Sequence, residues 1–259
     1  MLLVTIFALV AIGSASMLLS TVSGGGNNVV MIPILVLAFN FSPGEAIGTS
    51  FLALTVGSAV AVAGFVRAGR LELKSGVAYG AQVAPGVVIG TYLSYLAEGP
   101  LFRLFLGLVV TSLAAAMLLR GRFRSVNAVP GTKPQSSPSP SQPRLAIILL
   151  VLTGFLAGFF GQGAGFVLVP VMQFIGLPIV AILGTVRIVG IMIGATGTLA
   201  RLSVHEVNFG YGAALAAGTA IGGFLGVKIG TKLKAEILRV VVASLIALLG
   251  VLLVVTSLF

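Results

Sequence analysis

Two glycine-rich clusters combine a flexible backbone with amide side chains, which is chemistry suited to anion binding. Each cluster interrupts an apolar stretch and is followed, after four apolar residues, by Pro33 or Pro170. Such clusters should break a helix, and the next helix would begin with free N–H groups at its positive end. Two such ends meeting near the membrane midplane would bind an anion, although glycines that only allow close helix packing are the alternative. The candidate ligands are Gly24, Gly25, Gly26, Asn27, Asn28, Gly161, Gln162, Gly163 and Gly165.

Arg187 is a basic residue deep inside an apolar segment, eight residues after Ile179 and thirteen before Ala200. An Arg at such a depth costs about 2.5–3.5 kcal/mol on the mild insertion scale, and a guanidinium binds an oxyanion through two N–H groups. We therefore expect Arg187 to be the counter-ion of a bound anion. The alternatives are a displaced segment boundary, snorkelling to an interface or pairing with a distant Glu. Thr49 and Thr185 are further candidate donors, unless each hydroxyl binds its own helix backbone.

The composition excludes an ordinary soluble enzyme. Of 259 residues 58% are hydrophobic and 8% charged, with a mean hydropathy of +1.19, whereas soluble domains are about 25% charged. The chain has no Asp and no Cys, and its five Glu lie near segment ends, Glu206 beside His205 in a loop that we expect to be solvated. Paired-carboxylate catalysis, thiolate metal sites and a buried carboxylate proton relay are all disfavoured. We expect no enzymatic activity, no metal and no cofactor.

The elements that must carry these residues are membrane helices. Apolar runs near the length that an α-helix needs to cross a bilayer alternate with short polar connections. They form two groups of five, so we predict repeats at 1–119 and 145–259 joined by a flexible Pro/Ser-rich linker at 120–144. In each repeat, a glycine-broken helix or re-entrant hairpin precedes three transmembrane helices. The predicted segments are Leu2–Val22, Val29–Phe39, Ala46–Val66, Gly76–Leu96, Leu101–Leu119, Leu145–Phe160, Phe166–Ile175, Ile179–Ala200, Phe209–Ile229 and Ile237–Phe259.

The two groups share landmarks in the same order. Besides the glycine clusters and prolines, Gly48-Thr49 matches Gly184-Thr185, and GVVIGTYL from Gly86 matches GTAIGGFL from Gly218. If the chain continues across the membrane at each break, nine basic residues face one side and five the other; if it reverses, the division is twelve against two. The positive-inside rule favours reversal, which makes the repeats inverted and the linker cytoplasmic. The net charge of +10 then reports orientation and not nucleic-acid binding.

The paired signatures GGGNNVVMIP and GQGAGFVLVP, the duplicated halves and the chain length resemble the TauE/SafE sulfite exporter family of membrane transporters. The resemblance covers nearly the whole chain except the linker. It implies secondary transport of sulfite, sulfoacetate, aromatic sulfonates or similar small anions across the inner membrane. The family usually has a near-continuous glycine run in both halves, and this chain departs from it at Asn27, Asn28, Gln162 and Ala164.

These observations predict an all-α, polytopic inner-membrane transporter built from two inverted repeats. The substrate would be sulfite, an organosulfonate or a similar small anion, held at the two broken helices while the halves rock to give alternating access. A passive anion channel and a transporter of another small organic anion are the alternatives. Coupling to Na⁺ or H⁺, the direction of transport and assembly into a homo-oligomer stay open. The lipid bilayer is an expected partner and nucleic acid is not.

Overall fold

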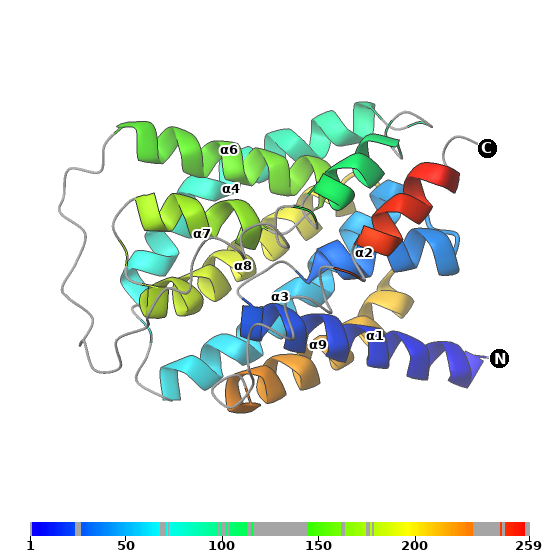
Figure 1. Cartoon of the computed structure of the whole chain (residues 1–259), viewed down its shortest axis with the longest axis horizontal. Coiled ribbons are helices and arrows are strands. Elements are labelled where there is room, and N and C mark those ends of the chain that lie inside the picture. Colours follow the sequence, from blue (N-terminus) through cyan, green and yellow to red (C-terminus); the bar gives the residue numbers. More distant parts are fainter. Residues whose placement is uncertain are drawn as a thin grey trace.

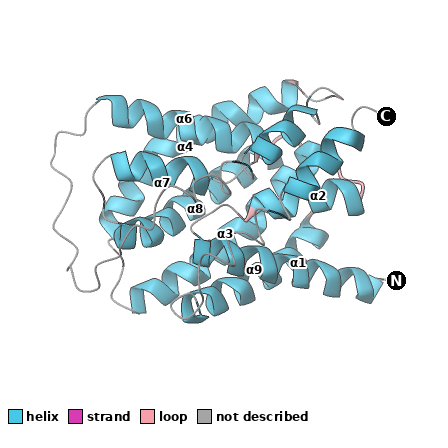
Figure 2. Cartoon of the chain, in the orientation of Figure 1, coloured by secondary structure: helices cyan, strands magenta, loops and turns pink. Residues whose placement is uncertain are grey.

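The computed structural model of the chain is all-helical over the part that it describes (Figures 1 and 2). The described residues are 2–23, 27–67, 71, 73–97, 99, 102, 104–112, 115, 144–161, 164–174, 177, 179–229, 244 and 247–256. The predicted linker therefore lies outside the described residues except for Arg144. The same is true of most of the last predicted segment and of the C-terminal part of the fifth.

Eight helices account for most of the described chain, and their bounds follow the predicted apolar segments closely. The predicted segment Phe209–Ile229 coincides with the last of these helices. Residues 104–112 and Ala247–Thr256 are also helical. The eight are α1 (Leu2–Ser23), α2 (Asn28–Ala38), α3 (Pro43–Arg67), α4 (Leu73–Leu96), α6 (Arg144–Phe160), α7 (Ala164–Phe174), α8 (Ile179–Leu202) and α9 (Phe209–Ile229).

Local signals explain where α3 begins. Ser42 lies immediately before the helix, and its hydroxyl accepts the backbone N–H of Glu45 at 3.1 Å. Pro43 occupies the first helical position, where its missing N–H costs nothing, and Glu45 lies in the first turn near the positive end of the dipole. Glu45 therefore lies where its negative charge stabilises the start of α3.

Four of the described helices, α1, α3, α8 and α9, contain stretches that are long and apolar enough to cross a membrane. The helices α2 and α7, which follow the two breaks, have 11 residues each. At 1.5 Å per residue such a helix is about 16 Å long, roughly half of a hydrocarbon core. The two helices beyond the breaks are therefore half-length elements.

The long helices pack in an order that is symmetric between the two halves of the chain. It runs α1, α9, α3, α8, α4, α6, with α2 packed on α3 and α7 on α8 (Figure 1). If α1, α3 and α4 are paired with α6, α8 and α9, exchange of the two halves leaves this order unchanged. The fourth helix of each half therefore packs against the first and third helices of the other half.

Glycines make the two outer helix pairs equivalent. A Cβ on Gly86 or Gly90 of α4 would collide with the backbone of Val151 or Phe155 on α6. On the other side of the molecule, a Cβ on Gly218 or Gly222 of α9 would collide with the backbone of α1 in the same four-residue rhythm. This is the small-residue packing that lets membrane helices approach closely, so the matching sequences around Gly86 and Gly218 have the same structural use.

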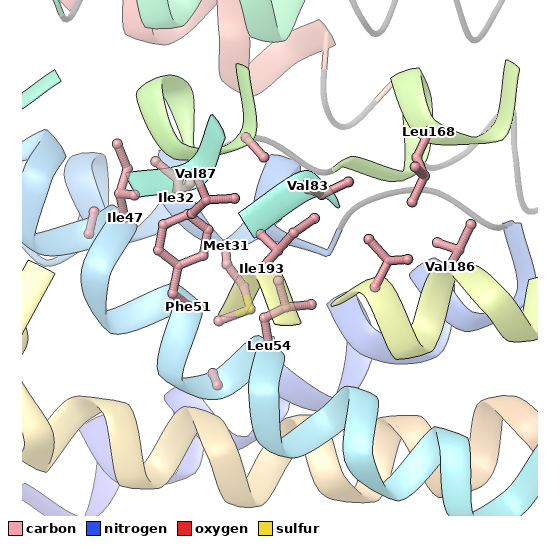
Figure 3. Close-up of a cluster of buried hydrophobic side chains, with 14 of the residues drawn as sticks. Met31, Ile32, Ile47, Phe51, Leu54, Val83, Val87, Leu168, Val186 and Ile193 are labelled. Carbon is pink, nitrogen blue, oxygen red and sulfur yellow. The ribbon is translucent and has the colours of Figure 1, made fainter. Parts of the chain in front are cut away.

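The core is one cluster of buried apolar side chains to which all eight helices contribute. Most of its members come from α2, α3, α4, α7 and α8. Figure 3 shows part of this cluster, including Ile32 of α2, Ile47 and Phe51 of α3, Val87 of α4 and Leu168 of α7. The cluster surrounds the region in which the described ends of the two breaks meet.

Candidate functional site

The two breaks meet at a side-chain hydrogen bond. Asn28, the first residue of α2, donates from Nδ2 to the carbonyl oxygen of Gly161 at 3.0 Å. Gly161 directly follows α6, so this contact joins the start of α2 to the end of α6 across 133 positions of sequence. We call the region around these two residues the junction. The contact joins one described residue of each glycine-rich cluster, whereas the meeting of the two helix N-termini stays a prediction.

Gly161 has a backbone conformation and surroundings that require glycine. Its φ is +64°, in the left-handed region that other residues adopt at a cost. A Cβ at this position would lie 2.6 Å from Cγ1 of Ile47 and 2.7 Å from Cδ1 of Ile32. These two isoleucines lie in the buried cluster (Figure 3), so one wall of the junction is apolar.

The amide groups of Asn27 and Asn28 are buried, and both side chains are 1% exposed. Asn27 precedes α2 in helical conformation without capping it, and its Nδ2 donates to Sδ of Met31 at 3.5 Å, a weak acceptor. The Oδ1 atoms of both asparagines are buried and accept no hydrogen bond within the part of the chain that the structure describes. A buried amide oxygen without a donor costs about 1–3 kcal/mol, so each points to a ligand.

Backbone donors lie at the same end of α2. The first helical bonds are made by the amides of Val30 and Met31, which donate to the carbonyl of Asn27 at 3.1 and 3.2 Å. The amides of Asn28 and Val29 come before these and have no acceptor within the helix. They lie at the positive end of the α2 dipole, which favours negative charge.

Arg187 lies within α8, and its side chain is buried in the protein at 3% exposure. The guanidinium contacts Ser20 of α1 through two nitrogens, Nη1 to the hydroxyl oxygen at 3.0 Å and Nη2 to the carbonyl oxygen at 2.5 Å. The Ser20 carbonyl is one of the last four of α1, which lack partners within the helix. The cation therefore lies beside the negative end of α1, where a helix stabilises it.

The two threonines lie near the ends of their helices and bind different partners. Thr49 in α3 is fully buried, and its Oγ1 accepts the backbone N–H of Asn208 at 3.0 Å. Thr185 in α8 is 2% exposed and donates to the carbonyl of Ala181 at 2.8 Å. Thr185 therefore bonds to the backbone of its own helix, which was the alternative to a role as a ligand donor.

Part of the predicted site is not covered by the structure. Gly24, Gly25 and Gly26 of the first cluster and Gln162 and Gly163 of the second lie outside the described residues. Gly165 is the second residue of α7, which begins at Ala164. No cluster of three or more His, Asp or Glu side chains occurs in the described ranges.

A second buried polar cluster was missed by sequence reasoning. Arg201 in the last turn of α8 is fully buried, donates from Nη2 to the hydroxyl of Ser94 at 2.6 Å and forms an ion pair with Glu206. The expectation that Glu206 is solvated is wrong, because it is 9% exposed and its charge is neutralised by Arg201. His205 is exposed as expected. The only sequence signal was the five-residue spacing of two opposite charges at the end of an apolar run.

The chain is similar to proteins that are named as probable membrane transporters. YunE, a probable membrane transporter protein of Bacillus subtilis (strain 168), is 26% identical over 268 residues, which cover 97% of this chain and 98% of YunE. A probable membrane transporter protein of Xylella fastidiosa (strain 9a5c) is 26% identical over 184 residues, or 70% of this chain and 65% of the relative. No solved structure matches.

The family match extends over most of the chain. Residues 9–253 match the family described as sulfite exporter TauE/SafE, which confirms the resemblance carried by the paired glycine signatures. Its relatives are named as membrane transporters, and the four apolar helices of membrane-spanning length fit that role. This chain is a multi-pass membrane protein that belongs to the sulfite exporter TauE/SafE family.

Proposed function

We propose that the protein is a secondary transporter that moves sulfite, an organosulfonate or a similar small anion by alternating access. The single observation that carries this proposal is the junction, where Asn28 of the first break meets Gly161 of the second inside the buried core. A pair of broken helices meeting within an apolar protein is a recurrent form of transporter binding site. The family and the transporter relatives support the class of function.

The preference for an anion rests on three features. The positive end of α2 faces the junction through Asn28, and the amides of Asn28 and Val29 precede the first helical hydrogen bonds. Arg187 supplies a buried positive charge that contacts Ser20 near the end of α1. Ser20 lies four residues before the first glycine cluster. We propose that the remaining ligands come from the glycine clusters and from Gln162, Thr49 and Thr185.

Alternating access requires two states that differ by a movement of the halves. We propose that the halves are inverted repeats, with the linker on the cytoplasmic side. The symmetric helix order supports a twofold relation between them, and the division of basic residues supports the inversion. Because α4 and α9 each pack on the opposite half, the moving units would be the packed groups of helices and not the sequence halves.

Counterflow in proteoliposomes tests the proposal. Purified protein is reconstituted with unlabelled sulfite inside, and uptake of radiolabelled sulfite is measured against sulfate, sulfoacetate, an aromatic sulfonate and a carboxylate as competitors. Saturable uptake stimulated by internal sulfite is expected for a carrier. A passive channel would instead give currents without counterflow. The absence of exchange with any of these anions, in protein shown to be folded, would contradict the proposed function.

A further inference from the structure

Two side-chain oxygen atoms at the junction are hydrogen-bond acceptors for which the described residues supply no donor. An anion would not satisfy them, because its oxygen atoms are themselves mainly acceptors. Oδ1 of Asn28 belongs to a side chain that is 1% exposed, and among the described residues no donor binds it. Its identity as oxygen is fixed by the other half of the amide, because Nδ2 donates to the carbonyl of Gly161, which can only accept. A ligand that satisfies Asn28 must therefore bring a hydrogen-bond donor or a cation.

The surroundings favour a donor group over a free cation. Asn28 is the first residue of α2, where the helix dipole repels positive charge. The wall next to Gly161 is formed by Ile32 and Ile47, whereas hard cations need several oxygen ligands. A hydroxyl group needs one acceptor, and Oδ1 of Asn28 provides it. Oδ1 of Asn27 is a second buried oxygen that accepts no bond at the same helix end.

We infer that the site binds its substrate as a singly protonated oxyanion, which carries one negative charge and one hydroxyl group. The charge lies toward the α2 amides and the hydroxyl donates to Oδ1 of Asn28. Hydrogen sulfite has this form, whereas sulfate at neutral pH and the alkylsulfonates have no hydroxyl. The inference rests on the proposed function and adds the protonation state of the substrate and the residue that selects it.

Wild-type protein tests the inference through the pH dependence of exchange. Vesicles are held at the same pH inside and outside, with total sulfite well below saturation, over a range that spans the second dissociation of sulfite. The initial rate should follow the hydrogen sulfite concentration and fall about tenfold per pH unit above that dissociation. Labelled methanesulfonate, a monoanion without a hydroxyl, should exchange at least about tenfold more weakly and show no such fall.

An Asn28→Leu variant tests the assigned residue, because leucine keeps the branched shape with the same number of heavy atoms and removes both amide atoms. In this variant the ratio of the hydrogen sulfite exchange rate to the methanesulfonate exchange rate should be about tenfold smaller than in the wild type. Ser58→Ala is the matched control, since the Ser58 hydroxyl is also fully buried and lacks a hydrogen-bond partner but lies against Gly190 of α8. This control should keep the wild-type preference.

Several results would overturn the inference. One is equal exchange of methanesulfonate and hydrogen sulfite by the wild-type protein. Another is a rate of sulfite exchange that stays level or rises with pH. A fall in methanesulfonate exchange parallel to that of sulfite would also overturn it, because the titrating proton would then belong to the protein. A third is exchange that needs Na⁺ in the wild type but not in Asn28→Leu, which would assign Asn28 to a cation. Failure of all anions to exchange would instead contradict the proposed function, so the two failures are distinguishable.

Discussion

The helices that precede the two breaks end in different chemical environments. Near the end of α1, the carbonyl and hydroxyl oxygens of Ser20 accept bonds from the charged guanidinium of Arg187. At the end of α6, the carbonyl of Gly161 accepts a bond from the neutral amide of Asn28. Both contacts satisfy carbonyl oxygens that a helix end leaves open, but only the first brings a charge.

The same difference appears at matched positions of α3 and α8. Gly48-Thr49 is followed by Ser50-Phe51, and Gly184-Thr185 is followed by Val186-Arg187. Phe51 is a buried apolar side chain of the core (Figure 3), whereas Arg187 is a buried cation. The two halves are therefore alike in their helix packing and unequal in the chemistry of their breaks. We expect the bound anion to lie closer to the first break.

The largest expected effect follows removal of the charge. Arg187→Gln should lower sulfite exchange by at least about a hundredfold, since loss of one member of a buried charge pair costs roughly 3 kcal/mol or more. Counterflow in proteoliposomes measures this, with Arg187→Lys as the charge-preserving comparison. Folding is checked by gel filtration and thermal unfolding. Unchanged exchange by Arg187→Gln would remove Arg187 from the site and end the proposed inequality of the two breaks.

The buried ion pair of the second half gives a large effect on stability. Glu206→Gln should destabilise the protein by about 3 kcal/mol, because it leaves the fully buried Arg201 without its carboxylate. Replacing both partners, as Arg201→Met with Glu206→Leu, should be less damaging than the single change. Thermal unfolding in detergent compares the wild type, Glu206→Gln, the double variant and its two single variants, Arg201→Met and Glu206→Leu. A double variant as unstable as the sum of its parts would show that the pair is not coupled.

Equivalent packing of the two halves predicts equal costs at matched glycines. Gly86→Ala at the interface between α4 and α6 and Gly218→Ala at the interface between α1 and α9 should each cost about 1–3 kcal/mol, because each Cβ meets backbone. Gly210→Ala is the control, since its Cβ would have an ordinary contact at 3.6 Å with Asn208. Melting temperatures that fall for one glycine and not for the other would contradict the equivalence.

The smallest perturbation tests the orientation of the chain in the membrane. The chain has no Cys, so a single Ser137→Cys in the linker gives one labelling site at no expected cost in activity. Because the division of basic residues predicts a cytoplasmic linker, an impermeant thiol reagent should label this site only after the inner face is exposed. Labelling in intact cells would reverse the proposed orientation.

The helices were predictable because the length of an apolar run decides them. The segments around α8 and α9 were predicted within two residues, and the break at Asn27 follows from glycine alone. The exchange of α4 and α9 between the halves was not predictable, because it depends on which helices pack and not on local sequence. For the same reason the burial of Glu206 was not predicted. Its partner Arg201 lies in α8 and also binds Ser94 of α4, so this cluster depends on the packing of two helices.

The candidate site was predictable in outline and not in detail. Duplication indicated that the two breaks would meet, and Asn28 and Gly161 do so. Nδ2 of Asn28 donates to the carbonyl of Gly161, which leaves Oδ1 as the acceptor for the ligand. This could not be predicted, because Gly161 lies 133 positions away in the sequence. The contact of Arg187 with the end of α1 was likewise beyond a reading of α8 alone.

A crystal structure with selenite tests the central claim most directly, because selenite resembles sulfite and selenium gives an anomalous signal. The account predicts one anomalous peak at the junction, on the side of the first break and placed so that a selenite oxygen lies within hydrogen-bonding distance of Asn28. Peaks confined to other parts of the molecule, with no peak at the junction under saturating selenite, would contradict the proposed site.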